Sequence, residues 1–242
     1  MNQISTICQL GIENQKLISR AIDLRRFDIV YELKHYDRRL WNLYCQKTRF
    51  DFVAHVANGR SLLVREGNMS FALSLARKKR INPENLVITT LETARNLSEE
   101  ALHNAEILKS YGATVMHNVN ATKLTTSLGN VQFGHIIFQF PHTGSREPIE
   151  GHNPNHILLR NFLRSAKQRL RYGGDILVTT VDSPHYHGAF QFELAAEKAG
   201  LKSPESYTFD PSDFPGYSHS MTNEDGSAVD NGTSCVTWIF RQ

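Results

Sequence analysis

The 242-residue chain has few cysteines and no long apolar segment. Its three cysteines, Cys8, Cys45 and Cys235, are far apart in the sequence, which argues against a disulfide framework and against a four-thiolate zinc site. No segment approaches the roughly 18 consecutive apolar residues of a membrane-spanning helix, and the amino-terminal residues have no pattern of a secretion signal. The sequence therefore predicts reduced thiols, no membrane association, and the cytoplasm as the default location.

Disordered and fibrous proteins are excluded by the composition, because hydrophobic residues make up 40% and charged residues 21% of the chain. The net charge of +3 is too small to indicate a nucleic-acid-binding protein by itself. The charge is unevenly distributed, however: residues 1–60 contain ten Lys and Arg against six Asp and Glu, while the remaining residues contain 17 against 18. The excess of positive charge therefore lies in the first quarter of the chain.

The periodicity of apolar residues changes near residue 57. Between residues 13 and 56 apolar residues recur at helical spacing, which predicts two or three helices. The segment 57–60 contains Asn and Gly, and short apolar segments alternate with helical ones after it. We therefore expect an N-terminal helical extension over residues 1–58 and a main domain over residues 59–242.

The main domain alternates between strand and helix patterns. Strands are expected at 61–64, 86–90, 114–117, 135–140, 175–180 and 235–240. Helices are expected at 70–77, 98–111, 155–171 and 190–198, the third ended by Gly173 and Gly174. Short connections between these units predict an open, doubly wound α/β sheet. The polar segment 210–232 is expected to be a surface loop, and a last strand that follows such a loop can run antiparallel.

Two residues suggest where such a sheet would bind a ligand. Gly67 lies in the turn after the first strand, where a backbone without a side chain can approach a ligand closely. Glu92 follows the second strand and can accept hydrogen bonds from both hydroxyls of a ribose. The G-x-G-x-x-G pattern is absent, and an ordinary turn and a solvated acid explain each feature equally well.

Four segments together resemble the ribosomal RNA uridine-N3 methyltransferase family. They are LLVREGNMSFA at 62–72, NVNAT at 118–122, HIIFQFPHTG at 135–144 and FPGYSH at 214–219. The resemblance extends from about Ser61 to Gln242 and implies a Rossmann-like class I methyltransferase fold, with a seven-stranded, mostly parallel sheet and an antiparallel last strand. It further implies S-adenosylmethionine as cofactor and methyl transfer to a base nitrogen of RNA, with uridine N3 of ribosomal RNA as the favoured target. A eukaryotic member would be nucleolar.

The resemblance also implies roles for individual residues. Cofactor-binding positions are Val64, Arg65, Glu66, Gly67, Asn68, Phe71, Glu92, Asn120, Ala121 and Gln139. Residues 66–68 would line the methionine end, Glu92 would bind the ribose, and residues 120–121 would flank the adenine. Gln139, Pro141 and His142 are the expected catalytic residues beside the transferring methyl group, and His142 is the candidate to take up or polarise the N3 proton of uridine.

Three positions differ from the family pattern. Arg65 replaces a glycine, Asn120 replaces an aspartate, and Gln139 replaces an asparagine. These differences leave two alternatives open. The first is a non-catalytic RNA- or protein-binding module with a degenerate cofactor site. The second is a small-molecule methyltransferase whose N-terminal helices form a lid.

Charged, aromatic and histidine residues are candidate binding sites for partners other than the cofactor. Arg160, Arg164, Lys167 and Arg171 would share one face of a helix that contacts RNA, extended by residues 78–80 and by Arg25, Arg26, Arg38 and Arg39. Ordinary solvated helix faces are the alternative. Phe71, Tyr186 and Tyr217 are candidates to stack on a flipped base. The pairs His152/His156 and His185/His187 have no nearby third ligand, so no metal site is expected.

Overall fold

The computed structural model describes residues 3–24, 29, 32–33, 36, 50–145, 147–149, 151–218 and 233–242. The chain divides into two compact units, Met1–Phe50 and Asp51–Gln242. In the first unit, helix α1 (Gln3–Asp23) buries Asn14, Ile18 and Ala21, which are spaced to share one helical face. The boundary suggested by the sequence falls after helix α3 (Phe52–Val56), which belongs to the second unit. The arginines at 25, 26, 38 and 39 lie outside the described residues.

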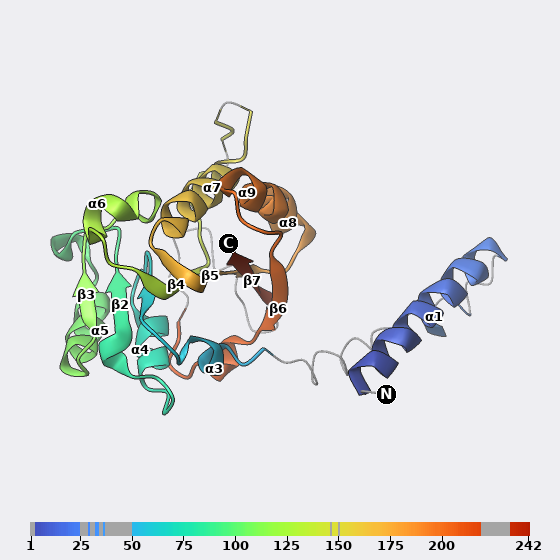
Figure 1. The fold of residues 1–242 in the computed structure, drawn as a ribbon, viewed down its shortest axis with the longest axis horizontal. Helices are drawn as coiled ribbons and strands as arrows, with labels where there is room; N and C mark the ends of the chain where they lie inside the picture. Colours follow the sequence, from blue (N-terminus) through green and yellow to red (C-terminus); the bar gives the residue numbers. More distant parts are fainter. Residues whose placement is uncertain are drawn as a thin grey trace. The chain divides into compact units, whose positions relative to one another are not determined.

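A seven-stranded sheet with the order β3-β2-β1-β4-β5-β7-β6 forms the centre of the second unit (Figure 1). Its strands are β1 (Ser61–Leu63), β2 (Leu86–Thr89), β3 (Thr114–Met116), β4 (Phe133–Gln139), β5 (Leu170–Val181), β6 (Glu205–Phe209) and β7 (Cys235–Arg241). The first five strands pair in parallel, and β7 pairs antiparallel with both β5 and β6. The predicted class I methyltransferase architecture, with its antiparallel last strand, is confirmed.

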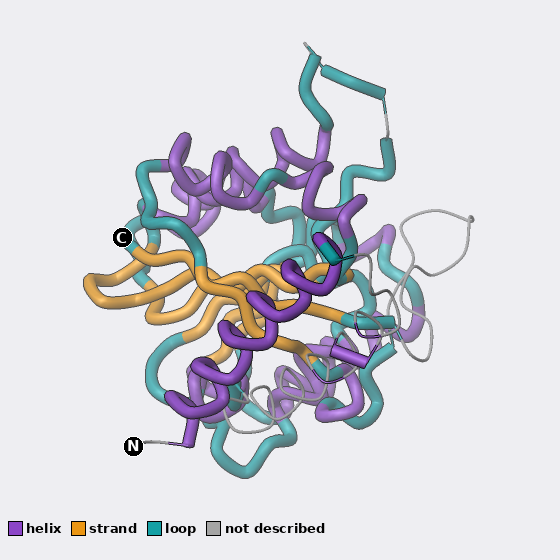
Figure 2. The backbone as a smooth tube through the Cα atoms, turned by 90° about the vertical axis from the view of Figure 1, so that its right-hand side faces the viewer, coloured by secondary structure: helices purple, strands orange, loops and turns teal. Residues whose placement is uncertain are grey.

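Helices cover both faces of this sheet (Figure 2). The helices after α3 are α4 (Ser70–Ala76), α5 (Glu99–Ser110), α6 (Leu124–Leu128), α7 (Pro154–Lys167), α8 (Pro184–Phe190) and α9 (Phe192–Ala199). Helices α4 and α5 lie on one face, and α6 to α9 lie on the other. None of the helices in the described ranges is long and apolar enough to span a membrane.

Burial of apolar side chains explains why the central elements form. Residues 133–138 of β4 are all buried, as expected for a strand covered by helices on both faces. Helix α7 buries Leu159, Phe162 and Leu163, whose spacing places them on one helical face. At the start of α5, Ser98 Oγ accepts a hydrogen bond from the Ala101 amide at 3.2 Å, so the predicted N-cap is confirmed.

The expected helix over 155–171 is too long. Helix α7 ends at Lys167, and β5 begins at Leu170, so Arg171, Gly173 and Gly174 lie in a strand. At Gly174 a Cβ atom would lie only 2.6 Å from the Gly134 carbonyl oxygen. The pairing of β4 with β5 shifts its register at this point. Gly174 is therefore required by the close approach of two strands, and it does not end a helix.

Two further elements differ from the sequence prediction. The helix expected at 190–198 is formed as α9, but α8, which precedes it and ends at Phe190, was not predicted; the two are separated at Gln191, whose φ is +48°. Strand β6 was not predicted from the pattern of residues, because Phe209 alone among its residues is buried. In the expected loop 210–232, residues Pro211–Asp213 form a short 3-10 helix, and 219–232 lie outside the described residues.

Candidate functional site

The carboxyl ends of β1 to β4 bring the predicted site segments to one edge of the sheet. Residues 64–68 follow β1, Glu92 follows β2, residues 120–121 follow β3, and residues 139–142 complete β4 and its exit. The chain runs outward from β1 to β3 on one side and from β4 to β5 on the other, so strand order reverses between β1 and β4. Open α/β sheets bind ligands in the crevice at such a reversal.

Backbone strain is concentrated at the same edge. Five described non-glycine residues have positive φ, and four of them follow or end these strands: Arg65 (55°), Met69 (59°), Asn118 (58°) and Phe140 (45°). A left-handed conformation costs a residue with a side chain about 1–2 kcal/mol. Such residues gather at functional sites, where the surrounding structure holds them in place. The strain marks this edge independently of sequence resemblance.

Glu66 is a buried carboxyl group inside the loop after β1. Its amide donates to the Thr89 carbonyl oxygen at 2.9 Å, and its Oε2 accepts from the Ala72 amide at 3.1 Å. Burial raises the pKa of Glu66 to about 7, and the hydrogen bond from Ala72 offsets part of that effect. The group can therefore change its charge near neutral pH.

Asn68 does not present its amide to the crevice. Its Oδ1 accepts from the Ser70 amide at 3.1 Å and from Ser70 Oγ at 2.8 Å. Its Nδ2 donates to Ser218 Oγ at 2.8 Å and to the Ser218 carbonyl oxygen at 3.2 Å. The side chain thus fastens the segment before residue 219 to the start of α4. Gly67, beside it, is exposed.

Arg65 turns its side chain toward Phe138 and Glu92. The guanidinium carbon lies 6.0 Å from the centre of the Phe138 ring, within the range of a cation–π contact. Burial lowers the pKa of Arg65, and the negative charge of Glu92 acts in the opposite direction. Arg65 therefore puts a positive charge near the exposed carboxylate of Glu92.

Asn120 uses its side-chain oxygen within its own turn. Oδ1 accepts from the Thr122 amide at 2.9 Å and from Thr122 Oγ1 at 2.8 Å. The Nδ2 group can only donate, so Asn120 would offer a donor where the family's aspartate offers an acceptor. Ala121, next to it, is buried.

The end of β4 carries a buried amide without a hydrogen-bond partner. Both Oε1 and Nε2 of Gln139 are buried and unpaired. An unpaired buried amide costs free energy, so a polar partner at this position would be favourable. Pro141 is buried, and His142 Nδ1 accepts from the Gly144 amide at 2.8 Å. In the neutral ring the proton of His142 is therefore on Nε2, which makes that nitrogen a donor.

Phe71 belongs to an aromatic cluster that the sequence pattern did not reveal. Its ring lies 4.8 Å from that of Phe214, 5.5 Å from that of Tyr217 and 5.8 Å from that of Phe52. Its side chain is 1% exposed. The ring therefore packs in the core, which leaves no face for a base or a cofactor.

The predicted RNA-binding face of one helix is formed only in part. Arg171 lies in β5, outside α7. Arg164 Nε donates to the Lys198 carbonyl oxygen at 3.1 Å, and Lys167 Nζ donates to that of Gly200 at 2.7 Å. These two side chains bind the carbonyl groups at the carboxyl end of α9, where a positive charge is favourable. Tyr186, a predicted base-stacking residue, stacks on Phe190 at an interplanar angle of 12°.

Comparison with known proteins identifies the family. The model of the family described as "rRNA (uridine-N3-)-methyltransferase BTM5-like" matches residues 62–221. An uncharacterized protein of Arabidopsis thaliana is 32% identical over 199 residues, which cover 75% of this chain and 91% of that protein. The 25S rRNA (uridine(2634)-N(3))-methyltransferase of Saccharomyces cerevisiae is 26% identical over 223 residues, 68% of this chain and 66% of that enzyme.

Among solved structures, TrmN from Thermus thermophilus is similar with a TM-score of 0.49 and 15% identity, over 82% of this chain and 48% of that chain. The family model spans more than half of the sequence and contains the segments that follow β1 to β4. The chain therefore belongs to the rRNA (uridine-N3-)-methyltransferase BTM5-like family.

Proposed function

We propose that this chain transfers a methyl group from S-adenosylmethionine to N3 of a uridine in ribosomal RNA. Membership of the family supports the reaction, and the yeast relative supports the class of substrate. The observation that carries the proposal is the unpaired amide of Gln139, which lies at the end of β4 beside the point where strand order reverses.

The residues at the strand ends fit S-adenosylmethionine. This cofactor carries positive charge on its sulfonium and its amino group, and an ionised Glu66 is a suitable partner because its pKa of about 7 allows it to lose its proton near neutral pH. Gly67 is exposed and leaves the backbone accessible, and Glu92 supplies a carboxylate for a ribose. When bound, the cofactor supplies an activated methyl group, so the protein mainly has to align the nucleophile.

Gln139 has the hydrogen-bonding groups that a uracil edge requires. A uracil presents the N3–H donor between two carbonyl oxygens, and a primary amide offers an acceptor next to a donor. The Oε1 and Nε2 of Gln139, which are buried, would turn toward the base in this proposal and hold it by its reacting edge. In this proposal Gln139 orients N3 toward the methyl group.

His142 acts in this proposal by polarising the base. Its Nδ1 lone pair is bound to the Gly144 amide, so the ring cannot accept the N3 proton there without losing that hydrogen bond. Its Nε2–H can donate to a carbonyl oxygen of the uracil and stabilise the negative charge that develops when N3 loses its proton. Release of the proton to solvent then completes the step.

Kinetics of two glutamine variants test this assignment. Purified protein is incubated with S-adenosylmethionine bearing a labelled methyl group and with ribosomal RNA transcripts. Gln139→Ala is expected to lower the rate of methyl incorporation by about 10²-fold, a typical effect of removing a positioned hydrogen-bonding group. Gln132→Ala, in the exposed residue before β4, is the matched control and should keep the wild-type rate. Equal rates for both variants would remove Gln139 from the reaction.

One observation favours a second candidate function, a non-catalytic RNA-binding module. Arg65, in the loop after β1, puts a positive charge near Glu92, where a ribose is expected to bind. If Arg65 closes the site, the protein should bind RNA with a steep dependence on salt and show no affinity for the cofactor. Measurable cofactor binding by the wild-type protein would exclude this candidate.

The remaining parts of the proposal concern organisation and location. We propose that the methyltransferase domain includes α3 and covers residues 51–242, and that the residues before it contribute to RNA binding through their excess of Lys and Arg. Methylation of ribosomal RNA would place the protein in the nucleolus of a eukaryotic cell and in the cytoplasm of a prokaryotic one. Fluorescence microscopy of the tagged full chain tests the location, and exclusion from both compartments would contradict it.

A further inference from the structure

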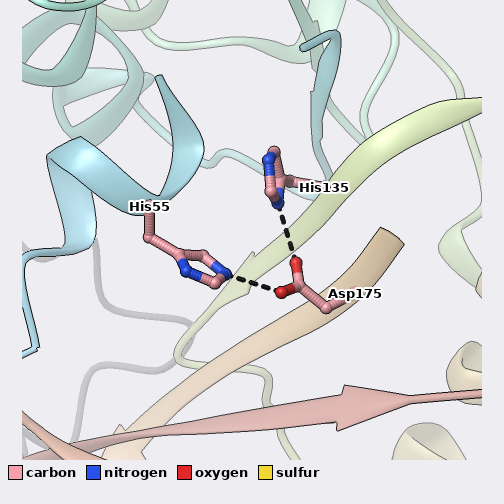
Figure 3. A group of neighbouring side chains, drawn as sticks. All are labelled: His55, His135 and Asp175. Atoms are coloured by element: carbon pink, nitrogen blue, oxygen red, sulfur yellow. Dashed lines mark hydrogen bonds and ion pairs between the residues drawn. The ribbon is translucent and has the colours of Figure 1, made fainter. Parts of the chain in front are cut away.

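Three side chains from separate elements meet near the amino ends of the central strands (Figure 3). His55 lies on α3, His135 on β4 and Asp175 on β5. His55 Nε2 lies 2.6 Å from Asp175 Oδ2, and His135 Nδ1 lies 2.8 Å from Asp175 Oδ1. His135 pairs in register with Ser61, the first residue of β1, so this cluster lies at the amino ends of the strands, away from the candidate methyl-transfer site.

The surroundings of His135 select one ring nitrogen for a ligand. Its Nε2 lies 3.1 Å from the Asn58 carbonyl oxygen, which can only accept a hydrogen bond. Nε2 therefore carries a proton. Nδ1, which shares a proton with Asp175 across 2.8 Å, is the nitrogen that would bind a metal ion once that proton is released. A histidine that donates one ring N–H to a backbone carbonyl while the other nitrogen faces a carboxylate has the orientation of a metal-binding histidine.

We propose that His55, His135 and Asp175 bind a Zn²⁺ ion. One ligand atom from each residue lies within 4.8 Å of the others. Zinc bonds of about 2.0–2.2 Å in a tetrahedral site place ligand atoms about 3.3–3.5 Å apart. The contacts of His55 with Oδ2 and of His135 with Oδ1 therefore have to lengthen, and one oxygen of Asp175 has to turn toward the ion. Two imidazoles and one carboxylate are ligands that zinc accepts, with a water molecule as the fourth.

Burial and charge at the cluster suit a cation. The side chains of Asp175 and His135 are only 6% and 10% exposed, while that of His55 is 25% exposed and leaves a path for the ion. Burial by itself raises the pKa of Asp175, but the hydrogen bonds from His135 and His55 outweigh it and hold the pKa at about 2. Arg241 lies opposite Asp175 in the pairing of β5 with β7. Its guanidinium donates to Glu205 at 2.8 Å, and the carboxylate of Glu205 offsets the positive charge of Arg241.

The expected role of this ion is structural. It would join α3 to β4 and β5, three elements that are distant in the sequence. This distance also explains why the spacing of histidines gave no sign of the site, since the pairs at 152/156 and 185/187 do not contribute to it. Removal of the ion should therefore lower stability and leave the geometry at the carboxyl ends of the strands intact.

Metal titrations of the full chain test the proposal. Metal-free protein is titrated with Co²⁺, whose visible absorption reports tetrahedral coordination, and is dialysed against Zn²⁺ with the bound metal measured by mass spectrometry. We expect one ion per chain, a rise in the melting temperature, and at least about tenfold weaker binding in His55→Ala. Circular dichroism verifies that this variant, which changes a partly exposed residue, is folded.

Asp182→Asn is the matched control. Asp182 forms an exposed pair with His187 at 3.1 Å, so this variant also removes a histidine-bound carboxylate, but one without a third ligand among the described residues. It should bind zinc as the wild-type protein does. Absence of a tetrahedral Co²⁺ spectrum in the wild type, or equal zinc binding by the wild type and His55→Ala, would overturn the proposal. The Co²⁺ spectrum of the wild-type protein tests the proposal even if a variant fails to fold.

Discussion

Arg65 is the residue at which this chain differs most consequentially from its family. It has a φ of +55°, a conformation that glycine adopts without strain, and its charge lies beside Glu92. We predict that Arg65→Gly binds S-adenosylmethionine at least about tenfold more tightly than wild type, or about 1.4 kcal/mol, because the competing charge is removed and the backbone can approach the cofactor more closely. Isothermal titration calorimetry measures the difference.

Arg65→Ala separates the two effects. It removes the guanidinium and keeps a Cβ atom at positive φ, so it should recover only the part that comes from competition for Glu92. If both variants bind the cofactor as the wild type does, Arg65 is not an obstacle at this site.

Glu66 should make folding stability depend on pH. Its folded pKa of about 7 lies above the ordinary 4.5, so the folded state holds the proton more tightly than the unfolded state does. The contribution of Glu66 to folding stability is therefore complete below pH 4.5 and is lost as the pH rises through 7, by at most about 3 kcal/mol. Urea unfolding between pH 4.5 and 8 measures the change.

Glu66→Gln keeps the shape and removes the charge, so its stability should lose this fall with pH. Glu92→Gln, at an exposed carboxylate, is the control and should keep the wild-type dependence. A fall of the same size in Glu66→Gln would assign the pH dependence to another group.

The first turn of α4 depends on Asn68. This side chain joins Ser70 to Ser218 through four hydrogen bonds. Asn68→Ala should cost about 1–3 kcal/mol of unfolding free energy, since it leaves buried polar partners unpaired, and it should increase hydrogen exchange of the amides before residue 219. Asn96→Ala, in an exposed 3-10 turn, is expected to change stability by less than about 0.5 kcal/mol. Equal effects of the two variants would contradict the role of Asn68.

Elements with several buried side chains could be predicted from the sequence, and the edge strand β6 could not. The buried residues of β4 and the single buried face of α7 appear as apolar periodicity, whereas β6 is an edge strand with one buried residue. Gly174 resembled a helix terminator because its real partner, the Gly134 carbonyl, is distant in the sequence.

In the candidate site, the positions of the residues could be predicted from the sequence, and their hydrogen-bond and packing partners could not. Motif resemblance gave the positions at the strand ends, and the topology brings them together at one edge. The partners of individual side chains were not predictable, because they depend on local turns and on remote segments. Asn120 is bound by its own turn, Asn68 by Ser218, and Phe71 by an aromatic cluster. The cluster at His55 combines three elements whose sequence separation hides it.

The second compact unit should fold without the first. Its hydrophobic core lies within residues 51–242 and includes Phe138, Phe162 and Trp238. A chain limited to these residues is therefore expected to keep a single cooperative thermal transition. Differential scanning calorimetry measures it against the full chain, and a broad, non-cooperative transition would show that residues 1–50 are needed for the fold.

The identity of the methylated nucleoside tests the central claim most directly. Ribosomal RNA is incubated with the wild-type protein and S-adenosylmethionine, digested to nucleosides and separated by chromatography coupled to mass spectrometry. The account predicts a product that coincides with authentic N3-methyluridine and is absent when the cofactor is omitted. A methylated nucleoside of another kind, or no methylated product at saturating cofactor, would contradict it.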